Sequence, residues 1–143
     1  MSRILVLADA AWVRNEVHAT LTDPDLELID ADDPVAAAVA AHEIGADVVV
    51  VDLQIAAMGG MAVARDIRNH ADLNGLPHIP VVMLLDRAAD TFLARRAGAA
   101  AWLTKPVDGA DLRDIVRRLL GPEPPADEAF HGDDVEDAPA VVA

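Results

Sequence analysis

The chain has 143 residues, of which 53% are hydrophobic, and this is enough apolar material for one ordinary core. Its 25 acidic and 11 basic side chains give a net charge of −14, which argues against direct binding to nucleic acid or to anionic lipid. The absence of cysteine excludes disulfides and thiolate chemistry and fits a reducing, cytoplasmic setting. No apolar run approaches the roughly 18 residues of a membrane helix, so direct membrane insertion is not expected.

Short apolar runs alternate with helical patterns along residues 1–120. The apolar runs predict strands at 4–7, 26–29, 47–52, 80–85 and 100–104. The helical patterns cover 11–22, 34–44, 88–97 and 108–120, and a further helix follows a loop that Gly59-Gly60 opens and runs to about Asn69. Residues 70–79 are predicted to be a loop. The continuously apolar run at 48–51 is typical of a central parallel strand that is covered on both faces. Strands that alternate with helices in this way predict a doubly wound α/β fold with right-handed crossovers.

A change of composition follows Gly121. The segment after it begins with Pro-Glu-Pro-Pro and contains seven acids but no lysine or arginine, so it carries half of the net charge. Such a segment cannot bury enough apolar surface to order itself. We therefore predict one folded domain over residues 1–120 and a disordered tail over 121–143.

Charged side chains follow several predicted strands at one edge of the sheet. Asp9 comes after the first strand, Asp52 ends the third and Lys105 follows the fifth. Ligands of open parallel sheets bind beyond the carboxyl ends of the strands, so these groups should converge. Two carboxylates can hold a hard cation such as Mg²⁺, and an ammonium can pair with a phosphate oxygen. The pattern therefore predicts a site where a phosphoryl group is attached to a carboxylate.

The chain resembles the receiver domain of response regulators over residues 3–120. The matching segments are ILVLAD, DVVVVDLQIAAMGG, IPVVMLL and AGAAAWLTKP. The resemblance implies the flavodoxin-like (βα)5 receiver fold, a five-stranded parallel sheet in the order 2-1-3-4-5. It also implies that Asp52 accepts the phosphoryl group, that Asp9, Asp52 and the backbone carbonyl of Gln54 bind Mg²⁺, and that Lys105 contacts the phosphate. The Lys105–Pro106 peptide bond is expected to be cis.

Several positions depart from the pattern of that family. Ala8 stands where a second acid is usual, and loss of an outer-shell metal partner costs about 10- to 100-fold in affinity. Leu85 replaces a serine or threonine whose hydroxyl bonds the phosphoryl group, a contact worth about 1.5–3 kcal/mol. We expect Leu85 to be a packed core residue and Mg²⁺ binding to be weak or absent. Trp102 occupies the aromatic switch position, and the loop after Asp52 carries Ile55-Ala56 and then Gly59-Gly60.

Two functions remain open at this point. The favoured one is a stand-alone atypical receiver of the two-component type that acts mainly as a protein–protein docking module or complex subunit, with impaired phosphorylation at Asp52. The alternative is a phosphorylation-switched single-domain response regulator that signals through Asp52. No nucleophile–base pair indicates an enzyme, and no helix-turn-helix or basic patch follows residue 120.

The expected partner surface is formed by the helix at 88–97, the strand at 100–104 and the helix at 108–120. Trp102 would be its aromatic anchor, surrounded by a basic rim of Arg95, Arg96, Arg113, Arg117 and Arg118. Alternatively, these arginines only pair with Asp90, Asp111 and Asp114 on the same helices, where each exposed pair is worth under about 1 kcal/mol. A histidine kinase is a further candidate partner. Asp86 and Arg87 are expected to pair within their loop, and the five histidines show no metal-binding spacing.

Overall fold

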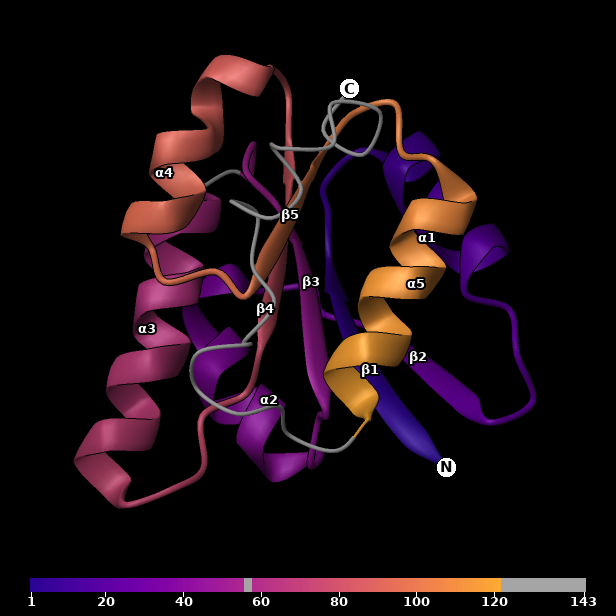
Figure 1. Cartoon of the computed structure of the whole chain (residues 1–143). Helices are drawn as coiled ribbons and strands as arrows, with labels where there is room; N and C mark the ends of the chain where they lie inside the picture. The colour runs from indigo at the N-terminus through magenta and orange to yellow at the C-terminus, as the bar shows by residue number, and fades with distance from the viewer. Residues whose placement is uncertain (56–57, 122–143) are drawn as a thin grey trace.

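A computed structural model describes residues 1–55 and 58–121 of the chain. Five parallel strands form one sheet in the order β2-β1-β3-β4-β5, which confirms the predicted fold and strand order (Figure 1). Their bounds are β1 Ser2–Leu7, β2 Leu26–Asp30, β3 Val48–Asp52, β4 Val81–Leu85 and β5 Ala101–Thr104. The predicted disordered tail lies outside the described residues, except for Gly121, which ends the last helix.

Helices cover both faces of the sheet. Their bounds are α1 Ala11–Thr20, α2 Ala37–Glu43, α3 Gly59–Asn74, α4 Thr91–Arg96 and α5 Gly109–Leu120, with short 3-10 turns η1 Pro34–Ala36 and η2 Ala88–Asp90 before α2 and α4. The buried side chains of α1 and α5 belong to one core cluster, and those of α2, α3 and α4 belong to the other. Figure 1 accordingly shows α1 and α5 on one side of the sheet and α3 and α4 on the opposite side. None of the helices in the described part of the chain is long and apolar enough to cross a membrane.

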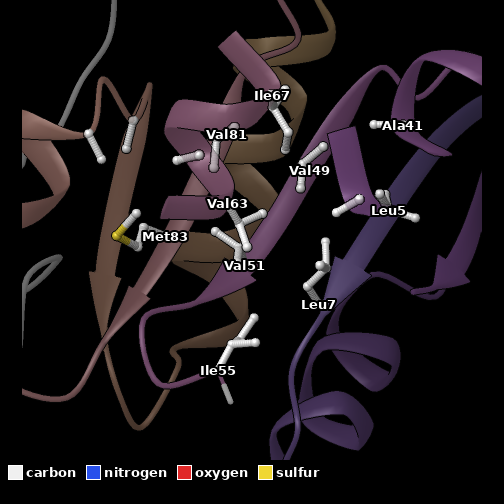
Figure 2. Close-up of a cluster of buried hydrophobic side chains, with 14 of the residues drawn as sticks. Leu5, Leu7, Ala41, Val49, Val51, Ile55, Val63, Ile67, Val81 and Met83 are labelled. Atoms are coloured by element: carbon white, nitrogen blue, oxygen red, sulfur yellow. The ribbon is translucent and has the colours of Figure 1, made fainter. Parts of the chain in front are cut away.

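The central strand β3 explains how one sheet separates two cores. All of its residues are buried, and successive side chains point to opposite faces. Val49 and Val51 pack with Leu5 and Leu7 under α2 and α3, as Figure 2 shows. Val48, Val50 and their neighbours pack under α1 and α5. A strand that is covered on both sides is apolar at every position, which is why this segment reads as an uninterrupted run of valines.

Two elements differ from their predicted form. Helix α3 begins at Gly59, so Gly59-Gly60 forms its first turn and not the predicted loop. The helix continues to Asn74 rather than ending near Asn69, because Ala71 is fully buried and extends the apolar face of the helix. Gly75 then ends the helix in the left-handed conformation, with φ 63°, so Asn74-Gly75 marks a helix end and not a longer loop. In α4, the 88–97 pattern predicts a longer helix, but the α-helix covers only Thr91–Arg96 after the 3-10 turn, and its Phe92 side chain is 56% exposed.

Candidate functional site

The structure brings Asp52 and Lys105 together at the carboxyl edge of the sheet. Asp52 is the last residue of β3 and is only 3% exposed, and Lys105 directly follows β5. The Lys105 Nζ donates a hydrogen bond of 2.8 Å to Asp52 Oδ1. The Gln54 backbone N–H donates to the same oxygen at 3.0 Å. The buried carboxylate is thus held by one charged and one neutral donor, and the Lys105–Pro106 bond is cis, as the resemblance implies.

A third charged group, Asp86, belongs to this cluster and was not predicted to do so. Its Oδ1 accepts a bond of 2.6 Å from Lys105 Nζ. The predicted pair between Asp86 and Arg87 is wrong, because the Arg87 Nη2 donates instead to Asp90 Oδ1 at 3.1 Å. Asp86 directly follows β4, at the same edge as the other two groups. Its position after a strand shows that Asp86 lies at this edge, but it does not show that the side chain contacts Lys105 rather than Arg87.

Asp52 and Asp86 shift the pKa of the Lys105 ammonium. Burial by itself lowers the pKa of Lys105, because desolvation disfavours the charged form. The hydrogen bonds and charges of Asp52 and Asp86 outweigh this effect, and the pKa is raised above its ordinary value of 10.5. Lys105 is therefore a firmly protonated cation between two anions at neutral pH.

The end of β1 contributes one carboxylate to the site, whereas the family pattern has two. Ala8 is 8% exposed and packs in the core under α1 and α5, and Asp9 follows it at the surface. The Arg14 Nη1 donates to the backbone carbonyls of both Ala8 and Asp9, each at 2.7 Å. A methyl group and a nearby guanidinium therefore replace the second acid, and sequence reasoning did not identify Arg14.

The donors that remain for a metal ion are sparse. The carboxylates of Asp9 and Asp52 and the carbonyl of Gln54 are of the type that Mg²⁺ takes. In residues 1–55 and 58–121, however, no group of three or more acidic, histidine or cysteine side chains is arranged to hold a metal. One Asp52 oxygen is already bonded to Lys105 and to Gln54 N–H. These donors are of the kind that binds Mg²⁺, but they are few. The cations Lys105 and Arg14 also bond to this edge of the sheet and reduce its attraction for a metal ion.

The switch positions are sealed inside the protein. Leu85 is fully buried, as expected for a core residue. Trp102 is 1% exposed, so the predicted exposed anchor at this position is wrong. Its side chain points toward α4, where the buried Ala94 and Ala97 leave room for the indole. The Arg95 guanidinium lies 5.7 Å from the centre of the ring, at cation–π distance.

The surface beside Trp102 carries a different aromatic group. Phe92 is exposed on α4, and Arg95 and Arg96 follow it at i+3 and i+4, on the same face of the helix. Arg113 and Arg117 are exposed on α5, on the other side of the sheet. The predicted arginines are thus at the surface, but Arg113 and Arg117 line a pocket with Thr20 and Leu21 beside α1, so they do not form one rim with Arg95 and Arg96. Phe92 rather than Trp102 is the aromatic side chain that a partner could contact.

Gly60 fixes the loop that follows Asp52. Its N–H donates to the carbonyl of Leu53 at 3.0 Å at the start of α3. A Cβ at this position would lie 2.5 Å from the Asp52 carbonyl oxygen and 2.8 Å from the Leu53 Cα. Only a residue without a side chain allows the helix to approach the site this closely.

Gly60→Ala should therefore destabilise the protein by about 1–3 kcal/mol, the usual cost of overpacking, and shift the backbone of Asp52. Gly109→Ala is the control, because its Cβ would meet nothing closer than Thr20 Oγ1 at 3.5 Å. The free energy of unfolding in urea should fall in the first variant and change little in the second. Equal stability of the two variants would contradict this account of the loop.

Comparisons with known proteins agree with this architecture. Residues 4–117 match the family model described as the response regulator receiver domain. The response regulator PleD of Caulobacter vibrioides is 34% identical over 121 residues, covering 82% of this chain and 26% of PleD. The chemotaxis protein CheY4 of Vibrio cholerae has a TM-score of 0.71 at 25% identity, covering 84% of this chain and 99% of CheY4. The receiver domain of the sensor histidine kinase PA1611 of Pseudomonas aeruginosa, solved with a magnesium ion in its active site cleft, has a TM-score of 0.71 at 22% identity, covering 85% and 98%.

A five-stranded doubly wound sheet with an acid–lysine pair at its carboxyl edge defines a receiver-type protein. The chain belongs to the response regulator receiver domain family and is thus a receiver domain of two-component signalling. It spans about a quarter of the length of PleD, the first of these relatives.

Proposed function

We propose that this receiver acts mainly as a protein–protein docking module or complex subunit, without enzymatic turnover of its own, and that phosphorylation at Asp52 is impaired. The observation that carries the proposal is the state of the two switch positions. Leu85 has no hydroxyl and is fully buried, and Trp102 is enclosed under α4. A ligand shifts a conformational equilibrium only by interacting differently with the two states. Leu85 cannot supply that difference by hydrogen bonding to a phosphoryl group at Asp52.

The residual chemistry of Asp52 follows from its contacts. An Asp52 carboxylate oxygen would attack the phosphorus of a phosphodonor, and the bond to the leaving group would break with its electron pair going to that group. Lys105 would then pair with a phosphoryl oxygen. Asp9, Asp52 and the Gln54 carbonyl would hold Mg²⁺, which supplies positive charge to the phosphoryl oxygens when it is bound. Ala8 and Arg14 weaken that binding.

The alternative function is a phosphorylation-switched response regulator that signals through Asp52. The observation that favours it is the bond of 2.8 Å between Lys105 and Asp52, which keeps the acceptor and the phosphate-contacting ammonium in place. The two proposals differ in whether binding of a partner depends on Asp52. Partner binding that is unchanged when Asp52 is substituted supports docking, and partner binding that requires Asp52 supports switching.

The proposed docking surface is formed by α4, β5 and α5 and is centred on Phe92. Phe92 supplies exposed aromatic area, which is favoured in energetically important contacts. Arg95 and Arg96 flank it on α4. Because the chain is otherwise acidic, this surface suits an acidic protein partner. A histidine kinase is one such candidate, in a cytoplasmic setting.

Binding of a partner purified from the native source should distinguish these functions. Phe92→Ala, or a paired Arg95→Glu and Arg96→Glu, should weaken binding by at least about tenfold, because an anchor contact is worth around 2 kcal/mol. Asp52→Asn should leave the affinity unchanged. Trp12→Ala is the matched control, since Trp12 on α1 is 57% exposed and Phe92 is 56% exposed.

The affinities can be measured by isothermal calorimetry with purified variants. If Asp52→Asn abolishes binding while the α4 variants bind normally, the docking proposal fails and the switching alternative takes its place. If Trp12→Ala weakens binding as much as Phe92→Ala, the partner surface is not confined to the face around Phe92.

A further inference from the structure

The Lys105 ammonium lies between two carboxylates that differ greatly in exposure. Its Nζ is 2.8 Å from Asp52 Oδ1 and 2.6 Å from Asp86 Oδ1. The side chain of Asp52 is 3% exposed, that of Lys105 is 10% exposed and that of Asp86 is 37% exposed. Asp86 is therefore the member of the cluster that faces solvent, where a phosphodonor would arrive.

The backbone holds Asp86 beside Lys105. The N–H of Lys105 donates to the carbonyl of Leu85 at 2.7 Å, which ties the end of β5 to the residue that precedes Asp86. The contact between the two side chains thus arises from two adjacent strand ends and not from a chance meeting of long surface side chains.

An ammonium has three donor positions, and Asp52 and Asp86 occupy two of them. A phosphoryl group that arrives at Asp52 would have to share an ammonium whose charge is already offset by two carboxylates. It would also have to approach the negative charge of Asp86, and like charges repel at this distance. We propose that Asp86 is a built-in anionic competitor that occupies Lys105 and keeps the site from accepting a phosphoryl group.

The state of Lys105 agrees with this role. Lys105 is only 10% exposed and its Nζ lies within hydrogen-bond distance of both carboxylates, so the ammonium is held by both partners. An ion pair with one partner as exposed as Asp86 contributes little to folding stability. Removing the Asp86 carboxylate should therefore change the chemistry of the site much more than the stability of the fold.

The proposal rests on the proposed function in one respect, which is that Asp52 is the phosphoryl acceptor. It adds the reason why acceptance is impaired, and it places that reason on a residue outside the acceptor and its metal donors. Substitutions at Asp86 can therefore test it while the acceptor itself remains intact.

The test is the rate at which acetyl phosphate with Mg²⁺ labels the purified chain, followed by intact-protein mass spectrometry. Wild-type protein should be labelled slowly or not detectably. Asp86→Asn, which keeps the shape and removes the charge, should raise the rate by roughly 2- to 5-fold, the effect of losing one partly exposed charge interaction. Asp86→Glu keeps the charge and should stay near the wild-type rate. Glu43→Gln, at an exposed acid on α2, removes the same charge elsewhere and should have no effect.

A second probe, fluoroberyllate, reports on anion binding without covalent transfer, and Asp86→Asn should bind it more tightly than wild type. Asp86→Ala serves as a second variant if Asp86→Asn does not fold, as judged by its melting temperature. Equal labelling and equal fluoroberyllate binding in wild type and Asp86→Asn, including none in either, overturn the proposal. Label that persists in Asp52→Asn/Asp86→Asn shows instead that the acceptor assignment is wrong, which separates that failure from the failure of the competitor.

Discussion

Lys105→Met is expected to lower the free energy of unfolding by about 3 kcal/mol at neutral pH, because it leaves the buried Asp52 carboxylate without its cation. Asp52 is 3% exposed and, among residues 1–55 and 58–121, would retain only the N–H of Gln54 as a partner. Asp86 also loses its cation, but it is exposed enough to be hydrated. The cost therefore arises mainly at Asp52.

Urea denaturation of single and double variants separates this cost from lost packing. Lys105→Met combined with Asp52→Asn should recover most of the stability, because no buried charge then lacks a partner. Glu27→Gln is the control, since it breaks the exposed pair with Arg3 and should cost less than about 1 kcal/mol. A double variant that is no more stable than Lys105→Met would show that the Asp52 charge is not the cause.

The alkaline pH dependence provides a check on the same ion pairs. The pKa of Lys105 is raised above 10.5 in the folded protein, so its ion pairs stabilise the fold fully below that pH. This contribution is lost as the pH rises through the folded-state pKa, where the ammonium is deprotonated. Wild type should therefore lose more stability than Lys105→Met over that alkaline range.

The fold could be predicted from the sequence because each strand has a local signal. The valine run of β3 indicates a strand covered on both faces, and the positions of Asp52 and Lys105 follow from the rule that parallel strands end at one edge. Such signals depend on a residue and its neighbours in the chain. They therefore give the architecture and part of the site without any knowledge of tertiary packing.

The contacts that could not be predicted depend on packing between elements. Asp86 meets Lys105 because β4 and β5 end side by side, whereas the sequence places Asp86 next to Arg87. Trp102 is buried because Ala94 and Ala97 on α4 leave the space for an indole, and the sequence does not show which helix covers the strand. For the same reason the sequence does not show that Phe92, an apolar residue on the same helix, lies at the surface.

Ala8→Asp is expected to raise the affinity for Mg²⁺ by about 10- to 100-fold, the usual effect of one supporting acid on a metal site. Ala8 follows Leu7, which pairs with Val51, so a carboxylate at this position would lie at the same edge as Asp52. Trp12, on the first turn of α1, and Trp102 provide fluorescence signals for the titration. Ala19→Asp adds the same charge at an exposed position of α1 and should not change the affinity.

The same substitution should couple metal binding to folding. Ala8 is 8% exposed, so an added carboxylate is partly desolvated and should destabilise the metal-free protein. Mg²⁺ should then restore stability in proportion to its binding, which a melting curve with and without the ion measures. Arg14, whose Nη1 bonds the carbonyls of Ala8 and Asp9, will offset part of the new charge, so Ala8→Asp combined with Arg14→Gln should bind the ion more tightly still. An unchanged affinity in both variants would mean that the missing acid at position 8 is not what weakens this site.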